Sequence, residues 1–343
     1  MLRKAGFMVA LVFVLLAGCS GNKIETIIDK PQTDKEEVAA KPVNTYPLTG
    51  VGTDEEVNHR AVSVMVNNHP KARPQSGLSK ADVVYEVLAE SNITRFLAIY
   101  QSEFPENIGP IRSARDYYIE LAKGYESLYI FHGWSPDAKK LIQSDYIDHL
   151  NGLNHDGTLF KRSSDRKAPH NSYITYENIL EGAQKEGYSM EENTPPYSFF
   201  SDDETGLISG DDYKVAALSY GSLDYDVTYK YDSASEKYTR HTAGVRTEDQ
   251  DTKDPVLLDN ILIVEAIHKV IDDKGRRSID LTAGGDAYLL QKGKRLEIQW
   301  VSKDGRIVPV SGETEVKLVQ GKTWINIIPD QPGLNNSVKL SND

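Results

Sequence analysis

Cysteine and positive charge are both scarce in this sequence. Cys19 is the single cysteine among 343 residues, so an intrachain disulfide is excluded, together with thiol nucleophiles, zinc sites and iron–sulfur clusters built on cysteine. The 39 Lys and Arg residues are outnumbered by 51 Asp and Glu residues, which gives a net charge of −12. Nonspecific nucleic-acid binding depends on neutralising phosphates with Lys and Arg, so no nucleic-acid partner is expected.

Common catalytic and metal-binding motifs are missing as well. The sequence contains no H-E-x-x-H, no G-x-S-x-G, no P-loop and no EF-hand loop. No metal site and no cofactor are therefore predicted, and Mg²⁺ enters only with the enzyme alternative given below. Long hydrophobic runs are also lacking, because the apolar stretch from Gly6 to Leu16 is shorter than the roughly 20 residues of a membrane-spanning helix.

The start of the chain instead predicts a lipoprotein signal peptide over residues 1–18. Arg3 and Lys4 precede the apolar run, which ends in Leu16-Ala17-Gly18-Cys19. This ending resembles the lipobox of bacterial lipoproteins, in which the cysteine receives the lipid, and it differs from an ordinary A-x-A cleavage site. We therefore expect an acylated (palmitate-bearing) Cys19 that holds the protein at the cell membrane, on its extracytoplasmic face.

The remaining chain divides by composition into three parts. Residues 19–45 are polar and charged, with two prolines, and predict a disordered tether. Strand-like and helix-like segments alternate over residues 46–200, which predicts an α/β domain made of a mixed sheet with flanking helices. Residues 201–335 contain β-like segments with little helix and predict a β-rich, mainly antiparallel domain, with Trp300 and Trp324 in its core.

The local patterns of the α/β domain predict particular elements. Residues 61–66 and 128–132 are expected to form strands, and residues 81–90 and 93–103 a hairpin that turns at Ser91-Asn92. A helix is the alternative for residues 81–90, because Asp82, Glu86 and Glu90 repeat every four residues. Helices are expected after the N-caps Ser113, Ser135 and Thr175, the first of them ending at Gly124.

Positive charge gathers where a strand is expected to pass into the first of these helices. The segment "IGPIRSARDYY" places Arg112 and Arg115 on either side of Ser113, with Asp116 beside the second arginine. If Ser113 is the N-cap, Arg115 lies in the first turn, where a cation opposes the helix dipole by about 0.3–1 kcal/mol. This placement is favourable if an anion, such as a phosphate or a carboxylate, binds at the same end.

An internal salt-bridge network is the alternative. In a hairpin that turns at Ser91-Asn92, Leu88 faces Arg95, and Glu86 and Glu90 are its diagonal neighbours. These carboxylates stand close to Arg95 and could also pair with the arginines of the helix start. The sequence leaves both interpretations open.

Other polar groups follow the predicted strands. Because ligands of α/β sheets bind beyond the carboxyl ends of the strands, these groups are further candidates, although a single histidine or loop residue is more often structural. The complete set of candidate ligand-binding residues is Asn67, Asn68, Arg73, Glu86, Glu90, Arg95, Arg112, Ser113, Arg115, Asp116, His132, Arg166, His170 and Asn171.

Two resemblances bear on function. The segments "SVMVNNHPKARPQSGLSKADVVYEVLAESNITRFLAIYQSE", "IGPIRSARDYYIELAKGYESLYIFHGWSP", "RKAPHNSYIT" and "GKTWINIIPD" closely resemble the YerB-like lipoproteins of Gram-positive bacteria, which carry a two-part domain of unknown function. This resemblance implies a lipoprotein on the outer face of the membrane, with no established reaction. A fainter similarity, through Asp82, Ser113, Arg115 and Asp116, is to the LytR-CpsA-Psr phosphotransferases, although the proline of their motif and their membrane helix are missing here.

These observations predict an envelope lipoprotein that binds a phosphate-bearing ligand, such as a cell-wall precursor, or an envelope protein. The alternative is an enzyme of phosphoryl or glycosyl transfer in cell-wall glycopolymer metabolism, in which arginines stabilise phosphate charge and a carboxylate acts as base or holds Mg²⁺. A structural adaptor for wall-synthesis proteins is a third possibility.

Overall fold

The computed structural model describes residues 42–342. The predicted signal peptide, Cys19 and most of the predicted tether lie outside the described residues. The last two residues of the predicted tether, Asn44–Thr45, form strand β1, which pairs antiparallel with β2 (Gly52–Thr53). Between residues 42 and 342, no helix has the length and apolar character needed to cross a bilayer.

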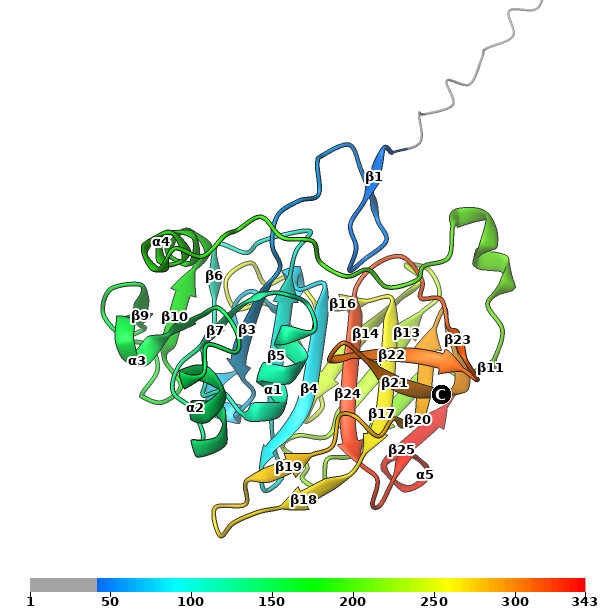
Figure 1. Cartoon of the computed structure of the whole chain (residues 1–343). Coiled ribbons are helices and arrows are strands. Elements are labelled where there is room, and N and C mark those ends of the chain that lie inside the picture. The colour runs from blue at the N-terminus through cyan, green and yellow to red at the C-terminus, as the bar shows by residue number, and fades with distance from the viewer. Residues whose placement is uncertain (1–41, 343) are drawn as a thin grey trace, which may run out of the picture. The chain divides into compact units, whose positions relative to one another are not determined.

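One large mixed sheet runs through the described part of the chain (Figure 1). Its order is β23-β22-β21-β20-β17-β24-β4-β5-β3-β7-β8, and β11 pairs with β21. The N-terminal half contributes β3 (Val62–Asn67), β4 (Val83–Glu90), β5 (Ile93–Tyr100), β7 (Leu128–Phe131) and β8 (His149–Asn151). The C-terminal half contributes β11 (Asp211–Asp212), β17 (Asn260–Ala266), β20 (Gly285–Gln291), β21 (Lys294–Lys303), β22 (Arg306–Ser311), β23 (Thr314–Glu315) and β24 (Thr323–Pro329).

The two halves of the chain join inside this sheet. Strand β24 lies parallel to β4, with Trp324 opposite Val84, and β17 lies parallel to β24 on its other side. The predicted fold class is therefore confirmed only in part. The protein is mostly β, its principal sheet is mixed, and the N-terminal strands share that sheet with the C-terminal strands instead of forming an α/β layer of their own.

Smaller sheets complete the β structure. A six-stranded sheet has the order β15-β14-β13-β12-β25, with β16 paired to β14. Its strands are β12 (Val215–Leu218), β13 (Val227–Asp232), β14 (Lys237–Thr242), β15 (Val245–Arg246), β16 (Leu257–Leu258) and β25 (Val338–Ser341). A three-stranded sheet contains β6 (Asn107–Ile108), β9 (Phe160–Arg162) and β10 (Ser172–Thr175), and a hairpin pairs β18 (His268–Val270) with β19 (Arg277–Ile279).

Two of the three predicted helix starts are confirmed. The Ser135 side chain accepts a hydrogen bond at the start of α2 (Pro136–Gln143), and the Thr175 side chain does so for α4 (Tyr176–Glu186). The remaining helices are α1 (Asp116–Lys123), α3 (Gly152–His155), α5 (Leu334–Ser337) and the 3-10 helices η1 (Pro70–Ala72), η2 (Leu78–Lys80) and η3 (Asp202–Leu207).

The predicted N-cap of α1 was wrong, although Gly124 does end the helix. The N-cap is Arg115, and Asp116 is the first helical residue. Ser113 instead donates its hydroxyl to the carbonyl of His132 at 3.1 Å, and Ala114 donates its backbone N–H to Gly133 at 2.8 Å. These contacts keep residues 113–115 extended beside the end of β7, so α1 begins two residues later than the local sequence indicates.

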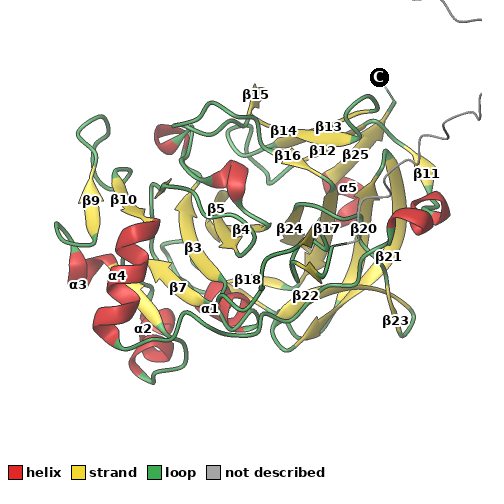
Figure 2. Ribbon diagram, turned by 90° about the horizontal axis from the view of Figure 1, so that it is seen from above, coloured by secondary structure: helices red, strands yellow, loops and turns green. Residues whose placement is uncertain are grey.

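The two faces of the large sheet bury different hydrophobic clusters. Helices α1 and α2 cover one face, where Tyr118 and Ile142 are buried. The six-stranded sheet and α4 cover the other face, as the view from above shows (Figure 2). Trp300 and Trp324 are 1% and 0% exposed, which confirms their predicted place in the core.

The hairpin of β4 and β5 forms as predicted, but in a different register. Val87 lies opposite Arg95, and the pairing shifts between Leu88 and Glu90. The expected Leu88–Arg95 pair was wrong because the sequence does not reveal this bulge, which inserts an extra residue near the turn. Glu86 and Glu90 share no hydrogen-bond partner among the described residues.

Candidate functional site

Glu90 forms ion pairs with two of the candidate arginines, Arg95 and Arg115. Its carboxylate accepts hydrogen bonds from Nη2 of Arg95 at 2.8 and 3.0 Å, and it forms an ion pair with Arg115. Arg95 also donates Nη1 to the carbonyl of Ser113 at 2.7 Å. Both guanidinium groups are buried. The internal salt-bridge interpretation therefore describes Arg95 and Arg115.

Arg112 differs from its two neighbours. Its backbone N–H donates to Met65 and its carbonyl accepts from His132, both at 2.9 Å, which fixes the residue between the ends of β3 and β7. Its guanidinium has no ion pair or hydrogen bond within residues 42–342, and its Nε atom is buried without a partner. Burial, followed by the charge of Arg95, lowers the pKa of Arg112 to about 10, so the group is still charged at pH 7.

Arg73 is a second cation without an acidic partner among the described residues. It donates Nε and Nη2 to the carbonyl of Asn68 at 3.1 and 2.8 Å, and Nε to the Asn68 side-chain oxygen at 3.0 Å. Its Cζ lies 5.3 Å from the centre of the Tyr225 ring. Burial, then the charge of Arg240, lowers the pKa of Arg73 to about 10. Its neutral partners position this guanidinium without cancelling its charge.

Two histidines stack beside these arginines. The rings of His69 and His170 have centroids 4.4 Å apart and an interplanar angle of 27°, and the amide nitrogen of Asn67 lies 2.9 Å from Nδ1 of His170. The pKa of each histidine is lowered, first by burial and then by surrounding positive charge that includes Arg112. Both rings are therefore mainly neutral at pH 7 and become charged only in more acid solution.

The hydroxyl of Tyr225 is a neutral hydrogen-bond donor that comes from the C-terminal half of the chain. It is 5% exposed, and its hydroxyl makes no hydrogen bond to any described residue. Burial raises its pKa, while the charges of Arg73, Arg95 and Arg112 act on it in the opposite direction. We refer to Asn67, His69, Arg73, Arg112, His170 and Tyr225 together as the Arg112 site. The exposed Asp224 acts on His69, Arg73 and Tyr225, and the buried Glu86 acts on Arg73 more strongly than Asp224 does.

Several candidates instead support the loops around the site. Arg166 donates to the carbonyls of Ala72 and Pro74 at 2.8 and 2.6 Å and thereby holds the loop that carries Arg73. The His132 ring lies 2.8 Å from the Ser172 hydroxyl and 3.0 Å from a guanidinium nitrogen of Arg162.

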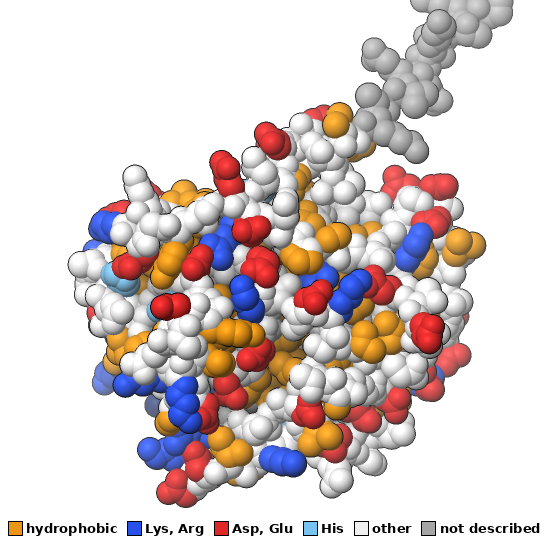
Figure 3. Space-filling model, viewed as in Figure 1, with side chains coloured by type: hydrophobic (Ala, Val, Ile, Leu, Met, Phe, Trp, Pro, Cys, Tyr) orange, Lys and Arg blue, Asp and Glu red, His pale blue; other side chains and the backbone are white. Residues whose placement is uncertain are grey.

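Two further candidates, Asn171 and Asp116, lie outside the Arg112 site. The Asn171 amide bonds to Ser163 and Arg162. Asp116, half-buried at the start of α1, lines a separate hollow with Asp137 and Asp272. On the face seen in Figure 3, positive and negative side chains are interspersed and form no broad basic surface.

Glu86 and Asn68 belong to a buried network that the sequence did not reveal. Glu86 accepts hydrogen bonds from Asn68 at 3.1 Å, Thr94 at 3.0 Å, Trp324 at 3.3 Å and Arg240 at 2.6 Å. Arg240 and Tyr225 were both missed because no local motif distinguishes either residue from an ordinary strand or turn position.

The residues that resemble the phosphotransferase motif are not brought together. Asp82 precedes β4 and accepts backbone hydrogen bonds from Gln101 and Ser102 at 2.6 and 2.7 Å. Arg115 pairs with Glu90, at the other end of the same eight-residue strand. At about 3.3 Å per residue, this separates the two ends by roughly 26 Å. Across residues 42–342, no three His, Cys, Asp or Glu side chains group in a way that could hold a metal ion.

Fold and site together define a mainly β protein whose unpaired cations lie where strand ends of the N-terminal half meet a loop of the C-terminal half. The chain belongs to the family described as "Protein of unknown function (DUF3048)", whose N-terminal domain matches residues 48–189 and whose C-terminal domain matches residues 216–325. The predicted boundary at residue 200 falls between the two matched ranges and stays a prediction.

The chain is similar to a protein of Bacillus subtilis (strain 168) named "Putative lipoprotein YerB", with 47% identity over 322 residues that cover 93% of each chain. It is also similar to the crystal structure of the YerB protein from Bacillus subtilis, with a TM-score of 0.80 over 87% of this chain and 99% of that one. The resemblance to YerB-like lipoproteins is thereby confirmed.

Proposed function

We propose that this protein is a lipoprotein anchored through Cys19 on the extracytoplasmic face of the membrane, and that its Arg112 site binds a phosphate-bearing ligand of the cell envelope. The anchor is supported by the lipobox-like sequence and by the name of the Bacillus subtilis relative. The binding function is supported above all by one observation, the half-buried Arg112 side chain, whose Nε is buried without a partner and whose guanidinium has no acidic partner among the described residues.

The physical argument concerns the desolvation of charge. A buried charge is costly unless an opposite charge and hydrogen bonds compensate it, and the protein compensates Arg95 and Arg115 through Glu90. Neither Arg112 nor Arg73 forms an ion pair with an acid among residues 42–342. An external anion between these two cations would supply the missing counter-charge, and its oxygens would also accept from the Tyr225 hydroxyl. Phosphate fits this donor set because guanidinium groups bind its oxygens with charge-assisted hydrogen bonds.

The transferase alternative receives no comparable support. It requires a carboxylate near the arginines that could act as base or hold Mg²⁺. Asp82 lies at the far end of β4, and Glu90 is already bonded to Arg95 and Arg115. The exposed Asp224, which acts on His69 and Arg73, is the carboxylate that this alternative would have to use. The Ser113 hydroxyl donates to a backbone carbonyl and not to the His132 ring.

Calorimetric titration of the purified full-length protein with inorganic phosphate and pyrophosphate tests the binding site. We expect saturable binding that is lost in Arg112→Ala and weakened at least tenfold in Arg73→Ala. Arg295→Ala is the matched control, because Arg295 pairs with Asp211 and Glu297 on a distant strand. Equal binding by a folded Arg112→Ala protein would rule out the site.

The anchor has a separate test. Cys19→Ser should move the protein from the membrane fraction to the soluble fraction of cells, while phosphate binding by the purified protein stays unchanged. If the Cys19→Ser protein remained in the membrane fraction, the proposed anchor would be wrong, and the binding site would be unaffected by that result.

A further inference from the structure

A cavity of about 330 Å³ lies next to the Arg112 site, between two loops from different halves of the chain. Asn68, Pro70 and Arg73 line it from the segment that follows β3. The turn from β14 into β15 and the residues after it line the other side. The volume is at the lower end of the range of about 300–1,000 Å³ for small-molecule sites, which suits a single ring-sized group.

The segment after β3 contributes to both the Arg112 site and the cavity. Asn67 and His69 contact His170, in the Arg112 site. Asn68 and Pro70, the alternate residues, line the cavity. Arg73 takes part in both, since it lines the cavity and its guanidinium lies over Tyr225. A ligand bound to Arg73 by its anionic group would therefore have its remaining atoms at the cavity.

The cavity wall combines apolar surface with hydrogen-bonding groups that are not used internally. Pro74, Ala243 and Val245 provide apolar atoms. The Arg240 Nε atom is a buried donor with no partner within residues 42–342. The Gln75 side chain donates its nitrogen to Asn67 and Asn68, whereas its oxygen accepts no hydrogen bond from any described residue.

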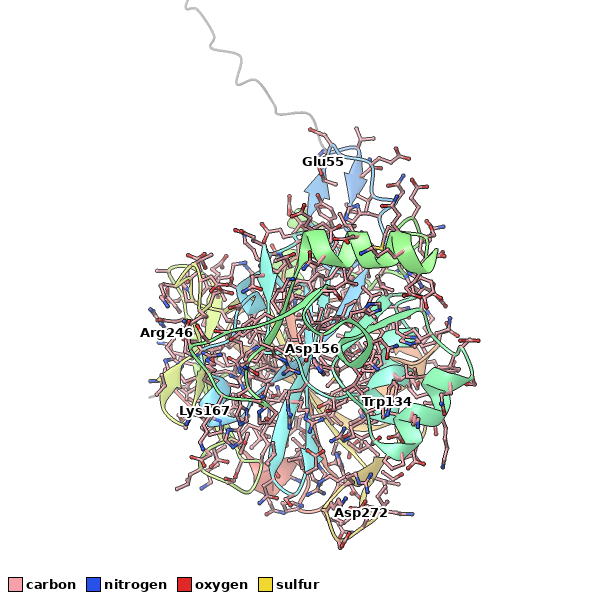
Figure 4. All side chains as sticks on the ribbon, turned by 90° about the vertical axis from the view of Figure 1, so that its left-hand side faces the viewer. Glu55, Trp134, Asp156, Lys167, Arg246 and Asp272 are labelled. Carbon is pink, nitrogen blue, oxygen red and sulfur yellow. The ribbon has the colours of Figure 1, made fainter. Side chains whose placement is uncertain are left out.

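This combination matches a sugar better than a lipid chain or a bare ion. A sugar ring presents hydroxyls that both donate and accept, together with C–H faces that pack on proline and valine. A wall that contains Arg73, Arg240 and Gln75 would leave these polar groups unsatisfied against an acyl chain, which is unfavourable. Arg246, which also lines the cavity, lies on the same side of the view in Figure 4 as Lys167.

We infer that the cavity binds the sugar ring of a phosphorylated sugar whose phosphate occupies the Arg112 site. This inference rests on the proposed function for its phosphate half and adds the class of the organic group. Because Arg73 contributes to both halves, the phosphorylated sugar should bind more tightly than either half by itself.

Titration of the full-length protein with N-acetylglucosamine 1-phosphate, glycerol 3-phosphate, inorganic phosphate and free N-acetylglucosamine tests the inference. We expect the sugar phosphate to bind at least tenfold more tightly than inorganic phosphate and glycerol 3-phosphate. Val245 lines the cavity mouth and is 71% exposed, so Val245→Trp should be tolerated by the fold and should remove this preference. Val301→Trp, at an exposed valine of β21, is the control and should retain the preference.

The outcomes separate the two proposals. Equal affinity for sugar phosphate and inorganic phosphate, or a preference that persists in Val245→Trp, would overturn the sugar site and leave the phosphate site standing. Binding of free sugar that Val245→Trp removes, without any binding of phosphate, would support the cavity and overturn the proposed phosphate function.

Discussion

Glu86 and Arg240 are 154 positions apart in the sequence and form a fully buried ion pair, with 2.6 Å between Oε2 and Nη2. The Arg240 guanidinium carbon also lies 4.6 Å from the centre of the Trp324 ring. The pair joins β4 of the large sheet to β14 of the six-stranded sheet. It therefore connects the two layers directly behind the cavity.

Removal of one partner of this pair should destabilise the protein strongly. Glu86→Gln leaves Arg240 charged and buried without a counter-ion, which should lower the free energy of unfolding by about 3–5 kcal/mol. Urea denaturation followed by tryptophan fluorescence measures the change. The control is Glu248→Gln, which removes the exposed pair with Arg246 and should cost less than about 1 kcal/mol. Similar effects of the two substitutions would contradict the role assigned to the buried pair.

Arg112 and Arg115 should respond oppositely to truncation. Arg115→Ala removes an ion-pair partner of Glu90 and should lower the free energy of unfolding by about 1–3 kcal/mol. Arg112→Ala removes a partly desolvated charge that has no acidic partner in the described part of the chain, so it should leave stability unchanged or increase it, while anion binding is lost. Urea denaturation of both variants without phosphate gives the comparison. A loss of stability in Arg112→Ala as large as that in Arg115→Ala would show that Arg112 serves the fold.

Acidification should strengthen anion binding at the Arg112 site. The pKa values of His69 and His170 are lowered by burial and by nearby cations, so their protonation adds positive charge only as the pH falls below 6.5. The charged groups that lower these pKa values are Lys71, Arg73, Arg112 and Arg166, whereas Asp224 raises the pKa of His69.

Sulfate is the suitable probe for this effect because, unlike phosphate, it does not titrate in this range. Its affinity should rise roughly tenfold between pH 7.5 and pH 5, a size expected for added unit charges at short range. The double variant His69→Gln/His170→Gln should bind sulfate with little dependence on pH. An equal rise in wild type and double variant would exclude the histidines as its cause.

His268 should make the fold sensitive to acid. Burial lowers its pKa from 6.5 to about 4, its Nδ1 lies 3.0 Å from the Ala266 carbonyl, and its Nε2 is buried without a described partner. Because the unfolded chain binds this proton more readily, the contribution of neutral His268 is complete above pH 6.5 and is lost as the pH falls towards 4.

This group alone should lower the free energy of unfolding by about 2 kcal/mol between pH 7 and pH 5. Urea denaturation at both pH values measures the change in wild type and in His268→Gln. The variant should lose about 2 kcal/mol less than wild type over this interval. Identical pH dependence in both proteins would disprove the prediction.

Features that depend on neighbouring residues could be predicted from the sequence. The side-chain caps at Ser135 and Thr175, the strand pair around Ser91-Asn92 and the burial of Trp300 and Trp324 all follow from local pattern. The N-cap prediction at Ser113 was wrong because the Ser113 hydroxyl bonds to the carbonyl of His132. His132 is distant in the sequence, so the local pattern carries no information about that contact.

The sequence could not predict which of the arginines would lack an acidic partner among the described residues. Arg112 and Arg115 have nearly the same sequence surroundings, and acidic residues are plentiful around both. A bulge in β4 places Glu90 beside Arg95 and Arg115, and Glu86 turns to Arg240 from the other half of the chain. The choice among these partners depends on register and on contacts between distant segments.

The sequence by itself determined the lipobox-like start, the acidic composition and the local elements, because each depends on residues that are adjacent or a few positions apart. Only the tertiary structure decided that β24 lies beside β4, that Tyr225 lies over Arg73, and that Arg112 has no acidic partner in the described chain. The physical reason is that a charge is compensated by whatever group the folded chain places within a few ångströms, and sequence distance does not limit that group.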